Sequence, residues 1–319
     1  MTTLADLTEL VRAPAALSVP GDVIAGAAAA GALSPRTPAL AGASVLLYWA
    51  GMAANDWADR RLDAEERPER PIPSGRVTPA AAVGLAAGLT AAGVGLAAAV
   101  GGRRAAALAV PLAATIWGYD LLAKNTAAGP AVMAACRGLD VLLGASGGRL
   151  TRALPAAATV AAHTWTVTAL SRREVTGADA SLPMRTLAGT ALVAASAAVA
   201  APGARRAAAR TAEQAGATDR AGAAGEIGVS AGRSRAAGIA GVLPAVLAGW
   251  YAARYGAAQA QVVRDPSAGR VRAAVGAGIT GLPALQGALT ARGGAGLLGV
   301  AVAAAAPLGR RLARKVSPT

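Results

Sequence analysis

The stretch AANDWADRRLDAEERPERPIPSGR, residues 53–76, is the one long polar stretch in a chain otherwise made largely of alanine, glycine, valine and leucine. The chain has 319 residues, 54% of them hydrophobic, and contains 40 glycines. This composition exceeds what the core of a soluble domain needs and is typical of a membrane protein. The stretch therefore separates apolar segments that can lie in lipid.

Apolar segments of roughly 17 to 25 residues, the length that crosses about 30 Å of hydrocarbon, recur along the chain. We expect an all-α polytopic transmembrane helical bundle of nine or ten helices, folded as a single domain over residues 1–319. The segments are rich in alanine, so each is weakly hydrophobic and small residues permit close packing of helices. They cover residues 15–33, 37–54, 79–100, 105–121, 127–146, 153–170, 184–202, 236–253, 273–290 and 293–308.

Residues 203–235 interrupt this series as an insert rich in arginine, alanine and glycine, which predicts a flexible connection between helices. The N-terminus lacks the short hydrophobic region and cleavage site of a signal peptide, so residues 15–33 are expected to stay as the first helix. The single cysteine, Cys136, excludes an internal disulfide and a cysteine metal cluster.

The charge distribution indicates an orientation. Thirty-one basic and 17 acidic residues give a net charge of +14. The arginines lie in short loops rather than in one patch, which argues against nucleic acid as a partner and fits the positive-inside rule. With the N-terminus inside, the inside loops carry 14 basic residues and the outside loops five. We therefore expect a multi-pass protein of the inner or plasma membrane, surrounded by membrane lipid, with the acid-rich loops cytoplasmic.

The acids of the polar stretch are regularly spaced. Asn55, Asp56, Asp59 and Asp63 read N-D-x-x-D-x-x-x-D, and if the preceding helix continues, the three aspartates share one face. Like charges stacked in this way repel each other, so the spacing indicates a cation among them. Mg²⁺ fits best because it takes oxygen ligands and bridges carboxylates to the phosphates of a substrate. The alternative is a solvated loop whose acids pair with neighbouring arginines.

This motif, followed by ERPERPIPSG at residues 66–75, resembles the first aspartate-rich motif of the UbiA superfamily of membrane prenyltransferases. The number and order of the spans are also similar to that family. Within it, WGYDLLAKNTAAGPAVMAACRGLDVLLG (117–144) most resembles a poorly characterised UbiA-like subgroup found in Ebo-type gene clusters. The resemblance implies magnesium-dependent transfer of a prenyl group from a prenyl diphosphate to a lipophilic or aromatic acceptor within the membrane.

The resemblance also implies roles for single residues. Asp56, Asp59 and Asp63 would hold the first Mg²⁺, Asn55 would bind the diphosphate or the water of the metal, and Arg70 would neutralise the leaving group.

The segment YDLLAKN (119–125) resembles a family motif in which a tyrosine is followed by a lysine that contacts the diphosphate. The resemblance therefore implies that Tyr119 and Lys124 lie at the substrate. An interfacial lysine that reaches water and an aromatic belt are the alternatives.

The second aspartate motif of the family departs from its pattern here. A D-x-x-x-D arrangement is expected after the sixth span, but HTWTVTALSRREVTGAD (163–179) keeps only Glu174 and Asp179 as acids. On a continued helix Glu174 shares a face with His163, and we expect Glu174 and Asp179 to hold a second Mg²⁺. Arg172 and Arg173 could supply the missing cation by touching the diphosphate, or they are ordinary cytoplasmic arginines.

Polar residues inside the spans form a further group. His163, the single histidine, makes an intramembrane hydrogen bond or acts on the acceptor. Arg137 and Asp140 are three residues apart in a span where isolated charges are costly, so we expect them to form an ion pair on the acceptor side of the bundle. Asp22 has no obvious partner.

Three other functions compete with prenyl transfer. CDP-alcohol phosphotransferases also place aspartates at a magnesium site, but their Asp-Gly and Ala-Arg fingerprint is absent from this sequence. A non-catalytic protein that binds an isoprenoid or another lipid would explain the degenerate second motif. A transporter would explain the charges inside the spans, but not the aspartates on one face. We predict a UbiA-type prenyltransferase.

Overall fold

The computed structural model describes residues 2–179, 181–199 and 227–305, and this part of the chain consists of helices and short connections. No strand occurs within it. The helices are α1 (Leu4–Leu10), α2 (Val19–Ala30), α3 (Thr37–Glu66), α4 (Pro79–Gly118), α5 (Gly129–Gly144), α6 (Leu150–Ser171), α7 (Ser181–Ala198), α9 (Ile227–Arg264), α10 (Ala268–Arg292) and the helix Gly296–Ala305.

The all-α prediction is confirmed, and wherever the structure describes the ten apolar segments they lie mainly in helices. Two of them share α4, which is kinked at Gly102, where φ is 65° and ψ is −159°. Only glycine adopts that conformation without strain. The kink therefore joins two predicted spans without an intervening loop.

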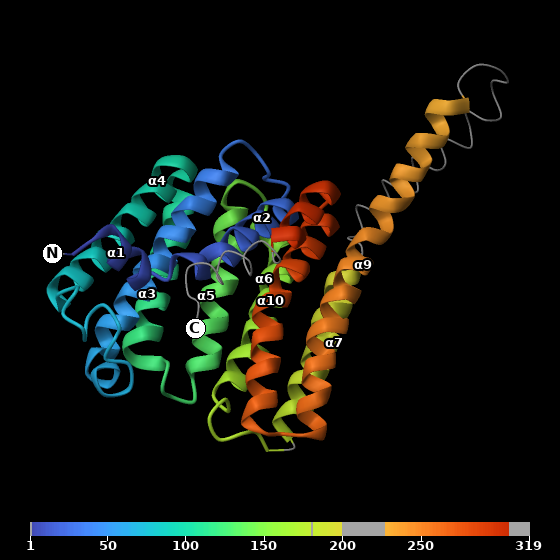
Figure 1. Cartoon of the computed structure of the whole chain (residues 1–319). Coiled ribbons are helices and arrows are strands. Elements are labelled where there is room, and N and C mark those ends of the chain that lie inside the picture. The colour runs from blue at the N-terminus through green and yellow to red at the C-terminus, as the bar shows by residue number, and fades with distance from the viewer. Residues whose placement is uncertain (1, 180, 200–226, 306–319) are drawn as a thin grey trace.

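The helices form pairs around a central one. In Figure 1, α3 packs along α4, α5 along α6, and α9 beside α7 and α10, while α2 contacts α3, α5, α6 and α10. Glycines allow this close approach. A Cβ atom on Gly26 would stand 1.8 Å from the carbonyl oxygen of Val141, and one on Gly144 would stand 2.0 Å from that of Val23. Small residues thus bring α2 and α5 into backbone contact.

The loops predicted on one side of the membrane lie at one end of the bundle, at the bottom of Figure 1. Contacts between loops fix this arrangement: the Ala178 amide donates to the Pro266 carbonyl at 2.9 Å, and Arg272 donates to the Glu174 carbonyl at 2.7 Å. We call this end, which carries residues 53–76, the motif end. At the opposite end the Arg149 amide donates to the carbonyl of Ala30.

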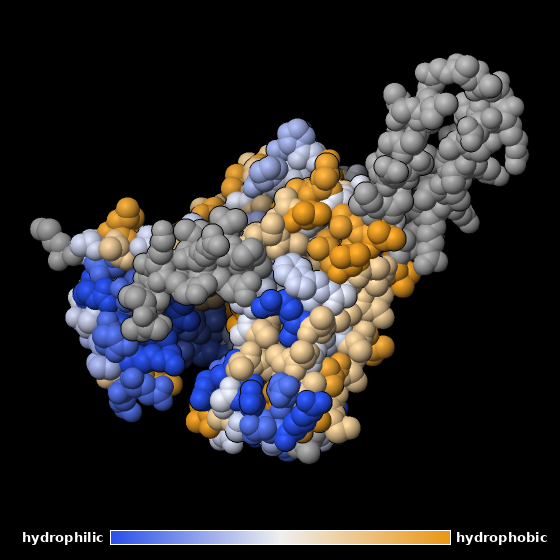
Figure 2. Space-filling model, turned by 45° about the vertical axis from the view of Figure 1, so that its right-hand side comes forward, coloured by the Kyte–Doolittle hydropathy of each residue, from blue (hydrophilic) through white to orange (hydrophobic). Residues whose placement is uncertain are grey.

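The surface separates by polarity. Figure 2 shows apolar residues along the side of the bundle and hydrophilic residues concentrated at the motif end. By length and mean hydropathy, Thr37–Glu66 and Pro79–Ala123 are the helices, among the described residues, that are long and apolar enough to cross a membrane.

The structure describes the last part of the predicted insert, residues 227–235. Residues 227–235 form the first turns of α9, which projects beyond the neighbouring helices in Figure 1. The rest of the predicted insert, residues 203–226, lies outside the described residues.

Candidate active site

The acid-rich stretch begins as helix. Helix α3 continues from the apolar segment to Glu66. It ends there because Pro68 disfavours the helical conformation at Arg67, where φ is −147° and ψ is 62°. The predicted continuation of the helix through the aspartates is therefore confirmed. Asp56 and Asp63 are buried, with 4% and 3% of their surface exposed.

Arginines from two segments neutralise the buried aspartates. Arg12 Nη2 lies 2.5 Å from Asp56 Oδ1, and Arg70 Nη1 lies 3.5 Å from the same oxygen. Arg70 Nη1 also lies 2.7 Å from Asp63 Oδ2. The sequence singled out Arg70, and the structure brings it into the first motif. Buried carboxylates need such partners because an uncompensated charge in this environment is costly.

Lys124 completes the cluster from the other side. Its Nζ lies 2.6 Å from Asp59 Oδ1 and 3.1 Å from Asn55 Oδ1. The lysine follows a π-helix, Tyr119–Ala123, and its amide donates to the Tyr119 carbonyl at 2.9 Å. A π turn holds one residue more than an α turn and is frequent at functional sites. The structure thus brings Lys124 to Asn55 and Asp59, which lie 69 and 65 residues before it in the chain.

The first motif is balanced in charge. Asp56, Asp59 and Asp63 face Arg12, Arg70 and Lys124, three acids and three cations. Because each aspartate turns toward a basic side chain, no three acidic, histidine or cysteine side chains of the described residues lie together in a position to hold a metal. The oxygen donors themselves suit Mg²⁺. A metal would therefore have to displace chain cations.

Sequence reasoning missed Arg12 as a member of the site. It lies 44 residues before Asp56, in a segment without any motif. Only the folded chain brings the two together, so no local signal could have found it.

Asp120 was also missed. Its residue surface is 6% exposed, and it lies within electrostatic range of Lys124, Asp59, Arg12 and Asp56. It stands inside the polar island that contains Tyr119 and Lys124, so an acid within an otherwise apolar segment was a signal that could have identified it.

A cavity of about 340 Å³ lies deeper in the bundle. Its wall includes Tyr119, Arg137 and His163, three residues that the sequence assigned to substrate binding, together with Tyr48 and Met52. Met52 precedes Asn55 by one helical turn on α3, so the cavity wall reaches the first motif. A cluster of charged side chains thus lies close to a largely apolar cavity.

The predicted ion pair between Arg137 and Asp140 is wrong, because Arg137 pairs with Asp22 instead. Arg137 Nε lies 2.7 Å from Asp22 Oδ2, whereas Asp140 accepts a short hydrogen bond from Ser44. The reason is the close packing of α2 on α5, which brings Asp22 to the arginine. Gln286 Nε2 also donates to Asp22 Oδ1 at 2.6 Å, so Asp22 has the partners that the sequence did not reveal.

His163 is both hydrogen-bonded and beside the cavity. Its Nδ1 lies 2.8 Å from the hydroxyl of Tyr251. The rings of Tyr251 and Tyr255 stand edge-on to the imidazole, at centroid distances of 5.3 and 5.5 Å. The structure thus shows a hydrogen bond of His163, as predicted, and places its side chain in the wall of the cavity.

Glu174 lies off the helix on which the sequence placed it. Helix α6 ends at Ser171, and Gly177 adopts a left-handed conformation with φ of 79°. Glu174 therefore lies in the connecting turn and does not share a helix face with His163, because the chain turns there to reach Pro266. Partial burial raises the pKa of the Glu174 carboxyl, and Arg272 opposes this shift.

Asp179 acts as a helix cap. Its Oδ1 accepts hydrogen bonds from the amides of Ser181 and Leu182, both at 2.9 Å, at the start of α7. These hydrogen bonds lower the pKa of the Asp179 carboxyl. Its oxygen is thus committed to the backbone of α7, which is the usual role of an aspartate at this position.

The two arginines after α6 are exposed. Arg172 donates a short hydrogen bond to the carbonyl of Thr126, two residues after Lys124, and Arg173 lies near Asp179. Neither arginine contacts an acid of the first motif in the described part of the chain. Arg172 instead ties the loop that carries Lys124 to the end of α6.

An α-helical bundle with an apolar side and a cluster of paired charges beside a cavity defines the class: a helical membrane protein. Residues 18–201 match the model described as the UbiA prenyltransferase family. The chain belongs to this family, whose members are integral membrane proteins. The narrower resemblance to the Ebo-type subgroup stays a prediction.

Curated relatives match over part of their length. The digeranylgeranylglyceryl phosphate synthase of Methanothrix thermoacetophila is 42% identical over 80 residues, which are 24% of this chain and 30% of that protein. The synthase of the same name from Natronomonas pharaonis is 44% identical over 85 residues, 26% of this chain and 31% of that protein. The chain spans less than a third of the length of these relatives.

Solved structures share the fold. A digeranylgeranylglyceryl phosphate synthase structure has a TM-score of 0.55 at 17% identity and covers 88% of this chain and 98% of that chain. The apo structure of a UbiA homolog from Aeropyrum pernix K1 has a TM-score of 0.53 at 18% identity, with 89% and 96% covered. At these identities the likeness shows the fold alone.

Proposed function

We propose that the chain transfers a prenyl group from a prenyl diphosphate to a lipophilic or aromatic acceptor within the membrane, and that the reaction depends on Mg²⁺. One observation carries the proposal: three acids and three cations meet close to Met52 and Tyr119, which line a cavity with a largely apolar wall. Family membership and the names of the relatives support it.

The first motif has the groups that a diphosphate needs. Asp56, Asp59 and Asp63 would hold Mg²⁺, which would neutralise negative charge on the leaving diphosphate, and Asn55 would bind the diphosphate or the water of the metal. The cations released from these carboxylates are then available to phosphate oxygens. Lys124 is placed for this exchange, because its Nζ already donates hydrogen bonds to the side-chain oxygens of Asn55 and Asp59.

Arg70 could also bind phosphate oxygens once a metal occupies the carboxylates. Its guanidinium is planar and offers several donors, so it can bind a phosphate through two parallel hydrogen bonds. In the structure it spans Asp56 and Asp63 at 3.5 and 2.7 Å. It can therefore move toward a phosphate while the two carboxylates take up a metal.

The cavity would hold the prenyl chain and exclude water. The allylic C–O bond breaks and the electron pair leaves with the diphosphate, which yields a carbocation. The acceptor then forms the new bond to that carbon and loses a proton. Tyr119 lines the cavity next to the first motif, where its ring face can stabilise a cation.

Arg137 and His163 would face the acceptor. Both line the cavity, and both are held in place from behind, Arg137 by Asp22 and His163 by Tyr251. Side chains fixed in this way position a ligand more accurately than mobile ones. The relatives are named for a synthase that forms a glyceryl phosphate lipid, which fits an acceptor of the lipophilic class.

Purified protein in lipid tests the proposal. Allylic diphosphates of several chain lengths are incubated with lipophilic and aromatic acceptors, and pyrophosphate release is followed with and without Mg²⁺. We expect release that requires both the metal and an acceptor. The rival function is non-catalytic lipid binding, favoured by Asp179, whose oxygen caps a helix instead of serving a second motif. Binding of prenyl diphosphate without pyrophosphate release under all conditions would support the rival.

The orientation is part of the proposal, because the motif end is expected in the cytoplasm. Cysteines placed at the exposed positions Ala64 and Ala127 in a Cys136→Ala background should resist a membrane-impermeant maleimide added to intact cells. Permeabilised cells provide the control, in which both sites should react. Labelling of both cysteines from outside would reverse the orientation.

A further inference from the structure

The segment before α2 is folded against the first motif. It contains α1 (Leu4–Leu10) and a 3₁₀ helix (Ala13–Ser18), and Leu10 and Val11 are buried in a cluster with Ala53 and Ile72. A helix of seven residues is too short to be stable alone. Its position therefore depends on contacts with α3 and with the loop that follows α3.

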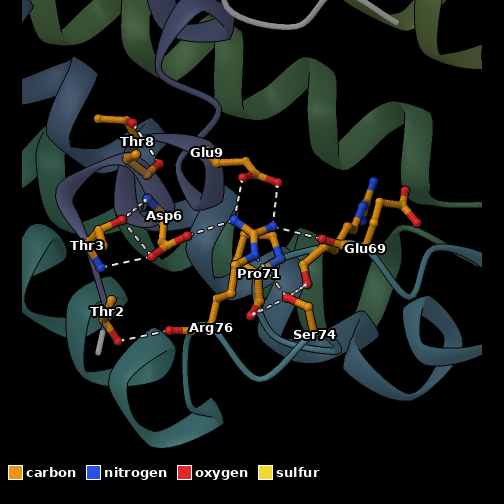
Figure 3. A network of polar contacts seen from close by, with 11 residues as sticks. Thr2, Thr3, Asp6, Thr8, Glu9, Glu69, Pro71, Ser74 and Arg76 are labelled. Carbon is orange, nitrogen blue, oxygen red and sulfur yellow. Dashed lines mark hydrogen bonds and ion pairs between the residues drawn. The ribbon is translucent and has the colours of Figure 1, made fainter.

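Arg76 makes the polar part of these contacts, shown in Figure 3. Its Nη1 lies 2.7 Å from both Asp6 Oδ1 and Glu9 Oε2, and its Nη2 lies 3.0 Å from Glu9 Oε1 and 2.7 Å from the Glu69 carbonyl. One guanidinium thus joins α1 to the loop between α3 and α4. We call this contact the Arg76 latch.

The latch stays charged at neutral pH. Hydrogen bonds from the hydroxyl and amide of Thr3, with Arg76, lower the pKa of Asp6 to about 2. Thr3 and Asp6 also form a capping box at the start of α1. The same carboxylate therefore caps the helix and binds the arginine, so helix formation and latch formation support each other.

The chain is strained where it leaves α1. Arg12 has φ of 45° and ψ of 53°, and it is the one non-glycine residue with positive φ in the described part of the chain. Such a conformation costs energy and persists where surrounding contacts hold it. The contact present here is the ion pair with Asp56, at 2.5 Å.

Arg12 stands on the solvent side of that pair. Its side chain is 39% exposed and that of Asp56 is 5% exposed. Arg70 lies 3.5 Å from the same Asp56 oxygen, so the carboxylate keeps a second cation if Arg12 moves. The guanidinium can therefore leave Asp56 without stranding a buried charge.

We propose that Arg12 is a diphosphate-binding residue, carried by the N-terminal segment and held at the first motif by the Arg76 latch. The inference rests on the proposed function. With Mg²⁺ held by the carboxylates of the first motif, Arg12 would be released from Asp56, and its guanidinium would bind a phosphate oxygen. The exchange keeps every charge paired.

Binding of inorganic pyrophosphate tests this without turnover. The full chain in lipid nanodiscs is titrated by calorimetry at fixed free Mg²⁺ and fixed ionic strength. We expect Arg12→Gln to weaken pyrophosphate binding by about 10- to 100-fold, as for the loss of one hydrogen bond between charged groups. Arg36→Gln removes the same charge at the other end of α3, where the structure shows no ion pair for it, and should bind as wild type does.

The outcomes separate the two proposals. Wild-type protein that binds no magnesium pyrophosphate would refute the proposed function itself. Wild-type binding with equal affinity in Arg12→Gln, or an equal loss in Arg36→Gln, would refute the role of Arg12.

Two further variants complete the test. If Arg12→Gln does not fold, Arg12→Lys decides, since it keeps the charge but replaces the planar guanidinium, which can offer two parallel donors to a phosphate, with a single ammonium group. A clear loss of affinity supports the proposal, and an unchanged affinity overturns it. Arg76→Gln should weaken binding less than Arg12→Gln, and wild-type affinity in that variant would overturn the latch.

Discussion

The two regions in which the sequence placed aspartate motifs differ in what their charges do. At the first motif, Asp56 and Asp59 hold basic side chains from other segments, and Asp63 holds Arg70 of the loop that follows α3. In the connection between α6 and α7, Asp179 caps a helix and Glu174 lies in a turn. The first region stores paired charge beside a cavity, and the second uses charge to end and begin helices.

This difference indicates where the binding energy for a diphosphate lies. Paired charges can exchange partners at little cost, because a metal replaces the cations and phosphates replace the carboxylates. A helix cap has no such alternative, since moving Asp179 would leave the amides of Ser181 and Leu182 without an acceptor. The proposed chemistry therefore depends on the first motif far more than on the second region.

The largest expected effect is at Asp59 and Asp56. Asp59→Asn and Asp56→Asn keep the shape of the side chain but remove the charge that a metal needs, and they leave Lys124 or Arg12 without a carboxylate partner. Turnover should fall by about 10²- to 10³-fold or more, as for the loss of a preorganised electrostatic group. Pyrophosphate release measures it, and a loss below tenfold in both variants would contradict the comparison.

Lys124 should give the next effect. Lys124→Gln removes a cation that lies 2.6 Å from Asp59, and we expect the affinity for prenyl diphosphate to fall by about 10- to 100-fold. The matched control is Arg152→Gln, which changes a charge at the opposite end of the bundle. Equal losses in both variants would mean that overall charge, rather than the first motif, governs binding.

The second region should respond more weakly, and in a defined order. Glu174→Gln should lower turnover by less than tenfold, because Glu174 lies in a turn and contacts Arg272 through its carbonyl. Arg172→Gln should have the larger effect, since it releases the loop that carries Lys124. A loss of about 10² in Glu174→Gln, the size expected for a catalytic charge, would restore a second metal site to the account.

The smallest effect on turnover is expected at Asp179. Asp179→Ala should leave turnover unchanged and lower thermal stability through the lost cap of α7. The folded pKa of Asp179 is depressed below its ordinary value of 3.8. Its contribution is therefore present above that value and is lost as the pH falls through the folded pKa. Thermal melts at neutral and acid pH measure it, and a stability difference that does not shrink as the pH falls below 3.8 would contradict the cap.

Much of the fold followed from local pattern. Apolar length and turn residues were sufficient to locate the helices, and the i, i+3, i+7 spacing placed the aspartates on α3 because helix geometry is local. Pairing across the bundle was not accessible in this way. The sequence paired Arg137 with Asp140, whereas close packing at Gly26 and Gly144 gave it Asp22.

The same distinction applies to the site. Asn55 and Lys124 were found because each lies in a recognisable polar island. Arg12 was missed because its role depends on a turn of the chain 44 residues from Asp56. The end of α6 was also misjudged, since the expected helix continued to Glu174 whereas α6 ends at Ser171.

The most direct test compares one residue of each region under identical conditions. Pyrophosphate release from an allylic diphosphate is measured for wild type, Asp59→Asn and Asp179→Asn, each with Mg²⁺ and with a chelator. The account predicts magnesium-dependent release in wild type, near-complete loss in Asp59→Asn and wild-type release in Asp179→Asn. Release that survives in Asp59→Asn but fails in a folded Asp179→Asn would contradict it.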